Sequence, residues 1–168
     1  MSAQPAKIRL LGPGDVEAFR SIRLEALRNE PAAFASSFED WARLSDEEWR
    51  RRLTDNPVFV AFDGTIPIGI MGLLRQRPSR MIHRATIVMV YVNPAYRGTG
   101  LSGHLLDVVF GHARESGVRQ LELAASAENP AAIQFYRRRG FSDVGRIPGG
   151  YLHEGREIDE ILMACRLS

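Results

Sequence analysis

The stretch NPAYRGTGLSGHLL, residues 93–106, decides how the chain is interpreted. It follows the apolar run ATIVMVYV and leads into the amphipathic segment LLDVVFGHARESG. Positions 97–103 alone hold an arginine, three glycines, a threonine and a serine, at the point where a predicted strand passes into a predicted helix. Glycines at such a junction allow a ligand to come close to the backbone.

This junction has the properties of an anion site. The first N–H groups of a helix have no partner within the helix, and the helix dipole adds about half a positive charge there. Gly98, Gly100 and Gly103 can adopt positive φ, and Arg97 can add a charge-assisted hydrogen bond. The pattern predicts a phosphate cradle. A glycine-rich turn that only lets the helix pack closely on a sheet stays open as the alternative.

Two other phosphate-binding folds fit this stretch poorly. A nucleoside triphosphate P-loop would end in Gly-Lys-Ser/Thr, which residues 93–106 do not contain. A dinucleotide-binding fold would have parallel strands and an acidic residue about twenty positions further on. The antiparallel hairpin predicted upstream argues against that arrangement.

The composition is that of one compact domain covering residues 1–168. The chain is 45% apolar and 25% charged, which is enough to build a core. Its net charge of +2, from 22 basic and 20 acidic residues, is too small to indicate nucleic-acid binding by itself. Cys165 is the single cysteine, and we find neither a signal peptide nor an apolar run of membrane-spanning length. We expect a soluble, cytoplasmic protein with no membrane or metal partner, and leave a homodimer open.

Hydrophobic spacing and turn signals predict alternating helices and strands. Ser45 and Glu48 form a capping box that begins a short helix, and Asp63-Gly64 marks a hairpin between two strands. Segment 32–44 is ambiguous. The pattern as a whole predicts a mixed α/β domain. Strands are expected at 7–11, 58–76 (as the hairpin), 83–92, 119–125, 141–147 and 157–167, and helices at 12–30, 45–53, 100–116 and 131–139.

A second stretch, ENPAAIQFYRRRGF at residues 128–141, follows the next predicted strand. Together the two stretches resemble the GNAT superfamily of acyl-CoA-dependent N-acetyltransferases. The family's cofactor loop reads Arg/Gln-x-x-Gly-x-Gly/Ala, and its following helix reads Asn-x-x-Ala-x-x-x-Tyr-x-x-x-Gly-Phe. YVNP at 91–94 and DEILM at 159–163 are similar to the family as well. The matching motif residues here are Arg97, Gly100 and Ser102, where Ser102 replaces the usual Gly or Ala, and then Asn129, Ala132, Tyr136, Gly140 and Phe141.

The resemblance implies a fold, a cosubstrate and a site. The implied fold is α/β (α+β), with a mixed, mostly antiparallel central sheet of six to seven strands flanked by about four helices. The implied cosubstrate is acetyl-CoA, whose pantetheine arm pairs with the backbone of Val90, Tyr91 and Val92. Arg97, Asn129 and Tyr136 are further cofactor ligands. The pyrophosphate would lie on the N–H groups of Gly98, Thr99, Gly100, Leu101, Ser102 and Gly103.

Tyr136 and Asn129 each have two interpretations. The resemblance makes Tyr136 a catalytic residue that protonates or hydrogen-bonds the departing thiolate. A tyrosine on a nine-residue helix beside Ala132 and Phe135 can also be a core residue. Asn129 precedes Pro130 and can be an ordinary helix N-cap as well as a cofactor ligand.

The general base is left open by the sequence. An amine of pKa about 10.4 is almost wholly protonated at pH 7, so attack on the thioester is helped by a group that takes its proton. Several enzymes of the family that acetylate protein N-termini carry a glutamate five residues before the motif asparagine, and that position is Ala124 here. Glu122 lies two residues earlier on the same strand face and is the catalytic candidate, with a solvated surface role as the alternative. Further alternatives are a water chain, His83, Glu128 and His153.

The acceptor side carries rings and charges but no specific motif. In the family, the acceptor binds between the loop after the first helix and the last strand pair, here AFASSFEDW at 33–41 and PGGYLHEGRE at 148–157. This mixture suits an amine-bearing small molecule or a peptide end. The side chains in question are Phe34, Phe38, Tyr151, His153 and Glu154.

The leading hypothesis is an enzyme, an N-acetyltransferase that moves an acetyl group from acetyl-CoA to a primary amine by direct attack in a ternary complex. A first rival is a catalytically weak CoA-binding regulatory or interaction module of the same fold, because the family glutamate is missing. A second rival is a nucleic-acid-binding module, suggested by Arg137, Arg138 and Arg139. Three consecutive helix residues point in three directions, so a solvated face explains them better and no nucleic-acid partner is expected.

Overall fold

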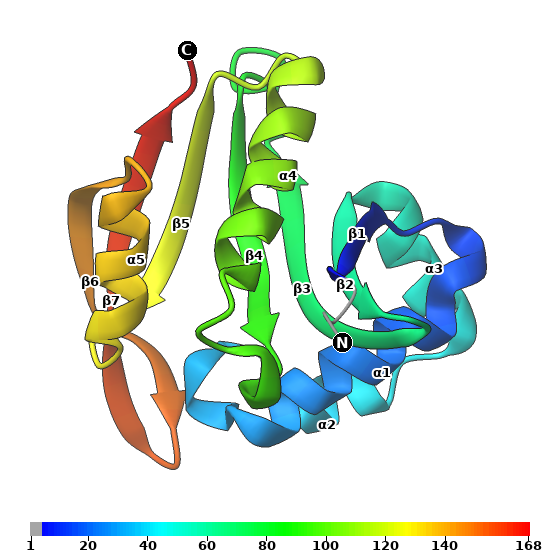
Figure 1. The fold of residues 1–168 in the computed structure, drawn as a ribbon. Coiled ribbons are helices and arrows are strands. Elements are labelled where there is room, and N and C mark those ends of the chain that lie inside the picture. Colours follow the sequence, from blue (N-terminus) through cyan, green and yellow to red (C-terminus); the bar gives the residue numbers. More distant parts are fainter. Residues whose placement is uncertain (1–4) are drawn as a thin grey trace. The chain divides into compact units, whose positions relative to one another are not determined.

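The computed structural model describes residues 5–168 and contains a seven-stranded sheet (Figure 1). Its strands are β1 (Lys7–Leu10), β2 (Val58–Asp63), β3 (Ile66–Arg75), β4 (Arg84–Val92), β5 (Gln120–Ser126), β6 (Ser142–His153) and β7 (Arg156–Arg166). Hydrogen bonds order them as β1-β2-β3-β4-β5-β7-β6. The pairs β1–β2, β2–β3, β5–β7 and β6–β7 are antiparallel, and β4–β5 is parallel. The predicted mixed, mostly antiparallel sheet is confirmed.

Five α-helices accompany the sheet in residues 5–168, and the chain divides into two compact units. The α-helices are α1 (Val16–Asn29), α2 (Phe38–Ala42), α3 (Asp46–Asp55), α4 (Leu101–Glu115) and α5 (Pro130–Arg138), with short 3-10 turns η1 (Pro13–Asp15), η2 (Pro31–Ala33) and η3 (Pro94–Tyr96). The first unit comprises the chain up to Leu74 together with Val88–His112, and the second comprises Arg75–Ile87 and Ala113–Ser168. None of the helices in residues 5–168 combines the length and hydrophobicity that crossing a bilayer requires.

The core of the first unit is centred on one face of α1. Phe19 is fully buried, and its ring meets the edges of two tryptophans, with ring centroids 5.9 Å from Trp41 and 5.1 Å from Trp49. Such edge-to-face contacts add to the free energy gained from burying the rings. Helix α1 thereby fixes the segment between η2 and α3. Other members of this core are Ile22, Ala26, Leu27, Leu53, Val58, Val60, Ile70 and Tyr91.

Reciprocal capping boxes begin α2 and α3. The predicted box at α3 is present: the Ser45 hydroxyl accepts from the Glu48 N–H at 3.2 Å, and the Glu48 carboxylate accepts from the Ser45 N–H at 2.8 Å. The ambiguous segment before it contains α2, which begins with the same arrangement between Ser37 and Asp40. Aspartate replaces the glutamate or glutamine of the usual signature, so this start was harder to find in the sequence.

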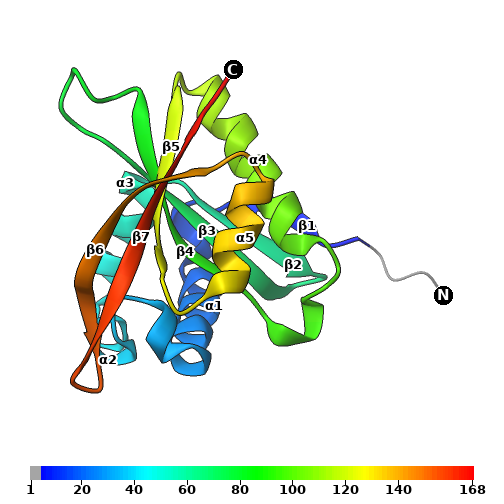
Figure 2. The same cartoon turned by 90° about the vertical axis from the view of Figure 1, so that its left-hand side faces the viewer.

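The β6–β7 hairpin of the second unit is longer than predicted (Figure 2). His153 pairs with Arg156, which leaves a two-residue turn at Glu154-Gly155. Both residues have positive φ, 51° and 75°, as a type I′ turn requires. Glutamate is not a usual first residue of that turn. The predicted strand ended at residue 147, whereas β6 continues to His153.

Candidate active site

The loop before α4 has the backbone conformation expected of an anion cradle. Gly98 and Gly100 have φ of 77° and 84°. A β-carbon built on either residue would meet no atom within 4 Å. These two glycines are therefore not required for close packing of the helix; they provide positive φ and an open backbone surface. This weakens the packing alternative and agrees with the predicted phosphate site.

Helix α4 begins where the loop can direct its N–H groups at a ligand. The His104 N–H already donates to the Gly100 carbonyl at 3.1 Å, so the helical pattern starts at that carbonyl. The preceding N–H groups, of Leu101, Ser102 and Gly103, have no carbonyl one turn earlier in the helix to bond. The Thr99 hydroxyl donates to the Tyr96 carbonyl at 2.5 Å and holds the loop in shape. Open N–H groups on an accessible backbone fit a pyrophosphate.

Arg97 ties this loop to the rest of the first unit. Its Nε donates to the Val92 carbonyl at 3.1 Å, and its Nη2 forms an ion pair with Glu30 at the end of α1. The Glu30 carboxylate occupies a position on the guanidinium that a phosphate would also use. Sequence reasoning missed this partner, because it lies 67 residues away and no local signal connects the two residues.

The end of β4 is irregular and hydrogen-bonded through its side chains. Met89 has a φ of 57°, which is strained for a residue with a β-carbon. The Tyr91 hydroxyl accepts from Asn29 at 3.0 Å, and burial raises the pKa of Tyr91 to about 12. Asn93 donates to the Glu25 carboxylate at 3.1 Å. The strand segment proposed for the pantetheine arm is therefore held against α1 by polar contacts.

A cavity of about 280 Å³ lies beside the loop in the first unit. Within its wall, the Tyr96 hydroxyl donates to the Asp63 carboxylate at 2.5 Å, which joins the loop to the β2–β3 turn. Thr99 and Leu101 of the predicted cofactor site border this cavity. The other lining residues are Pro5, Ala6, Ile68 and His104.

Tyr136 belongs to the second unit, where α5 buries it among rings. The residue is 6% exposed, and its ring makes edge contacts with Phe135 and Phe141 at centroid distances of 5.2 and 5.5 Å. Burial raises the pKa of the Tyr136 phenol above its ordinary value. The phenol therefore stays protonated at physiological pH, as a proton donor must. Burial among rings is equally what the core-residue interpretation predicts.

Asn129 is the N-cap of α5, as one of its two interpretations predicted. Its side-chain oxygen accepts from the Ala132 N–H at 3.1 Å, and Pro130 occupies the first helical position. The side-chain oxygen is therefore already engaged within the helix. A role as cofactor ligand would fall to the amide nitrogen or to the neighbouring backbone.

Glu122 is held by two partners on its own sheet. Arg84 donates to it from Nε at 2.5 Å and from Nη2 at 2.7 Å, and Gln120 donates at 2.8 Å. The hydrogen bonds from Arg84 are the main cause that lowers the pKa of the Glu122 carboxyl. The family position, Ala124, is exposed on the same strand. A carboxylate with a lowered pKa is a weaker base, so the geometry favours a structural contribution from Glu122.

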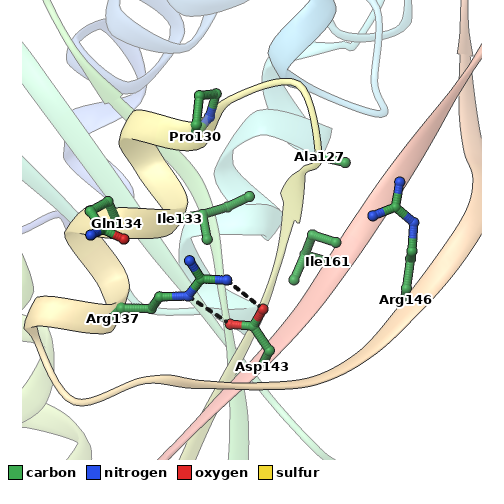
Figure 3. A pocket seen from close by; sticks show the side chains of 8 residues that line it. All are labelled: Ala127, Pro130, Ile133, Gln134, Arg137, Asp143, Arg146 and Ile161. Carbon is green, nitrogen blue, oxygen red and sulfur yellow. Dashed lines mark hydrogen bonds and ion pairs between the residues drawn. The ribbon is translucent and has the colours of Figure 1, made fainter.

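A second cavity, of about 440 Å³, lies between α5 and the β6–β7 hairpin (Figure 3). One of its walls holds the ion pair of Arg137 with Asp143, whose N–O distance is 2.7 Å. Arg146, on another wall, pairs with Asp159. Both ion pairs are partly exposed, and each guanidinium is paired with a carboxylate of the second unit. The carboxylate partner of Arg137 weakens the nucleic-acid alternative.

The acceptor segment 33–41 packs its rings on arginines of α1. The Phe34 ring lies 4.9 Å from the guanidinium carbon of Arg23, and the Phe38 ring lies 5.0 Å from that of Arg28. Arg23 is itself buried, which sequence reasoning did not identify. A signal was present, because Arg23 lies one helical turn after Phe19, on the apolar face of α1.

The comparison with protein families identifies the chain. A model of the acetyltransferase (GNAT) family matches residues 19–141. The chain belongs to this family. The chain is 28% identical over 163 residues to the L-methionine sulfoximine/L-methionine sulfone acetyltransferase of Pseudomonas paraeruginosa, covering 96% of the chain and 95% of the relative. It is 26% identical over 132 residues to the mycothiol acetyltransferase of Brachybacterium faecium, covering 79% of the chain but only 39% of that relative.

Solved structures agree with the fold of this chain. A GNAT-family acetyltransferase from Streptococcus pneumoniae superposes with a TM-score of 0.84 at 23% identity, covering 97% of this chain and 99% of that one. A GNAT superfamily phosphinothricin acetyltransferase from Sinorhizobium meliloti, solved in complex with acetyl-CoA, gives a TM-score of 0.78 at 22% identity and covers 98% and 90%. The predicted GNAT fold is confirmed, and the family to which the chain belongs is one of acetyltransferases.

Proposed function

We propose that this acetyltransferase moves the acetyl group of acetyl-CoA to the primary amine of an amino acid or a similar small molecule, by direct attack in a ternary complex. The chain belongs to the GNAT family, and a structural neighbour of that superfamily was solved with acetyl-CoA bound. The observation that carries the proposal is the loop at Gly98–Gly100, whose open backbone and positive φ suit a pyrophosphate.

The acceptor class is supported by the relatives. The Pseudomonas relative, which the chain matches over nearly its whole length, is named for L-methionine sulfoximine and L-methionine sulfone. Both are amino acids with a free amine and a carboxylate. The mycothiol acetyltransferase match covers only 39% of that relative and supports acetyl transfer without indicating the acceptor.

The proposed chemistry needs one proton donor and one proton acceptor. We assign the donor role to Tyr136, whose buried phenol stays protonated and can supply a proton or hydrogen bond to the leaving thiolate. Glu122 remains the side-chain candidate for the acceptor role. Its ion pair with Arg84 makes it a poor base, which leaves a water chain to bulk solvent as the alternative route.

The direct test is acetyl-CoA-dependent release of free thiol, measured with a panel of primary amines at fixed pH. The panel contains L-methionine sulfone, L-methionine sulfoximine, the standard amino acids, a dipeptide and simple alkylamines. We expect at least one amino acid to raise thiol release far above the rate without acceptor. If no amine does so while CoA still raises the melting temperature, the CoA-binding module is the better description.

A further inference from the structure

The guanidinium group of Arg23 is buried, and most of its N–H groups have no hydrogen-bond partner within residues 5–168. The residue lies on the inner face of α1, is 3% exposed, and is the one charged residue buried to this degree within residues 5–168. Its Nε and Nη1 atoms are buried and have no hydrogen-bond partner in that part of the chain. These two nitrogens carry three of the five N–H donors of an arginine. Unpaired donors on a buried charge are rare in folded proteins.

Within residues 5–168, the surroundings of Arg23 offer rings, and no carboxylate forms an ion pair with it. Its guanidinium carbon lies 4.5 Å from the centroid of the Trp41 ring and 4.9 Å from that of Phe34. A second guanidinium, of Arg52, lies 4.2 Å from the same Trp41 ring. Burial, together with the charge of Arg52, lowers the pKa of Arg23 to about 10, so the group remains a cation at neutral pH.

Ring contacts alone do not replace what the guanidinium loses on burial. A cation above an aromatic ring gains electrostatic attraction, but its N–H groups keep no acceptor. A second cation on the same ring adds repulsion. An anion would supply acceptor atoms for the free N–H groups and cancel the excess positive charge. A carboxylate matches the planar donor set of a guanidinium particularly well.

We propose that Arg23 is the binding site for the carboxylate of the acceptor, so that the preferred acceptor carries its amine and a carboxylate in one molecule. This inference rests on the proposed function and names the group that selects the substrate. Phe34 and Trp41, the rings that contact Arg23, both lie in segment 33–41, which was predicted to face the acceptor. Phe34 is half-buried in the short stretch 34–37, between η2 and α2, which has no helix or strand. Because Arg23 is only 3% exposed, the proposal requires this ring to move aside when the acceptor binds.

The first test compares an acid with its amide. The best amino acid from the amine panel and its primary carboxamide are assayed with the wild type and with Arg23→Gln, Arg23→Lys and Arg52→Gln. The wild type should prefer the acid in kcat/KM. Arg23→Gln should reduce this acid-to-amide ratio about 10- to 100-fold, mainly through KM of the acid, and Arg23→Lys should restore part of it. Arg52→Gln, which removes the exposed guanidinium from the same ring, should leave the ratio unchanged.

A purely structural Arg23 would give a different pattern. Its replacement would lower the melting temperature and change the acid and the amide equally, and that result overturns the proposal. A wild type with no preference for the acid overturns it too, without any need for a folded variant. An equal loss of the ratio in Arg52→Gln would show a general effect of positive charge and would also contradict a specific site.

A binding measurement separates this proposal from the proposed function. N-acetyl-L-methionine and its amide are titrated into the wild type while tryptophan fluorescence and melting temperature are recorded, because Trp41 lies beside Arg23. A saturable response to the acid alone, absent in Arg23→Gln, would support the carboxylate site even if no amine were acetylated. Acetylation of amino acids without such a response, and with an unchanged acid-to-amide ratio in Arg23→Gln, would leave the proposed function intact and remove Arg23 from it.

Discussion

Arg84 and Glu122 are joined by two hydrogen bonds, of 2.5 Å from Nε and 2.7 Å from Nη2. β4 and β5 run parallel here, with Arg84 opposite Gln120 and Thr86 opposite Glu122. The ion pair therefore runs diagonally between the two strands. Only 19% of the Glu122 side chain is exposed, so water screens the pair less than it screens a surface ion pair. The pair therefore stabilises the parallel pairing of β4 with β5 in the second unit.

This pair makes stability depend on pH in a defined direction. The pKa of Glu122 is lowered in the folded protein, so its contribution is present above the carboxyl pKa of the unfolded chain, about 4.3, and is lost as pH falls through the folded value. Glu122→Gln should therefore lower the melting temperature at pH 7, and its difference from the wild type should shrink below pH 4. The control is Glu128→Gln, which removes an exposed ion pair with Arg156 and should have a smaller effect at pH 7. Equal melting temperatures of wild type and Glu122→Gln at pH 7 would contradict a stabilising role of this ion pair.

The same residue tests the general base. A carboxylate with a lowered pKa is already deprotonated from pH 6 to 9, so we expect no rate limb from Glu122 in that range. Glu122→Gln should leave the shape of the kcat/KM profile unchanged between pH 6 and 9. An acidic limb in the wild type that disappears in the variant would instead identify Glu122 as the base.

Gly100 tests the phosphate cradle. Gly100→Val places a β-branched residue at a φ of 84°, and we expect a loss of stability of about 1–2 kcal/mol from backbone strain. The open space around the position means that the strain, and not a clash, is the cost to folding. CoA binding should weaken more than tenfold, because the side chain covers the backbone that a phosphate would use.

Gly111 is the matched control for this variant. It lies in α4, and a β-carbon there also meets nothing within 4 Å, but its φ is not positive. Gly111→Ala should bind CoA as the wild type does and gain up to about 1 kcal/mol of helix stability. Isothermal titration with CoA and thermal melting give both quantities. Normal CoA binding by folded Gly100→Val would remove the loop from the cofactor site.

Local features could be predicted from the sequence, and long-range partners could not. The loop conformation at Gly98 and Gly100, the α3 capping box and the hairpin after Asp63 depend on neighbouring residues, and each is present in the structure. The pairing of Arg97 with Glu30 joins positions 67 apart. Nothing in the chain near either residue specifies such a contact, because it arises only when the elements pack.

The same limit applies to burial and to turn chemistry. Arg23 was not recognised as a core residue because arginine is seldom buried, although its place on the apolar face of α1 indicated burial. The predicted end of β6 was wrong because Glu154-Gly155 is an unusual type I′ turn. The resemblance to acetyltransferases fixed the order of the elements but not these side-chain partners.

Variants of Arg97 and Glu30 test whether Arg97 is a cofactor ligand or only a member of a structural ion pair. If Arg97 binds the pyrophosphate, Arg97→Gln should weaken CoA binding about 10- to 100-fold, since a charge-assisted hydrogen bond is lost. Glu30→Gln breaks the same ion pair but removes a competitor of the phosphate, so CoA affinity should be kept or increased. Titration of both variants with CoA at two salt concentrations is the measurement. Equal affinities in the two variants would mean that Arg97 serves only to hold the loop on α1.

Tyr136→Phe tests the chemical step, because it removes one oxygen from a ring that is otherwise kept by Phe135 and Phe141. As a general acid, the phenol should contribute about 10- to 100-fold to turnover, the lower part of the range for such groups, because a thiolate is already a fair leaving group. Burial keeps the phenol protonated, so the effect should be the same across pH 6 to 9. The variant should bind CoA with unchanged affinity and melt close to the wild type. Single-turnover measurements with saturating acetyl-CoA isolate the chemical step from product release. Unchanged single-turnover rates would mean that Tyr136 is only a core residue of the second unit. A loss of CoA affinity with an unchanged chemical step would identify it as a cofactor ligand.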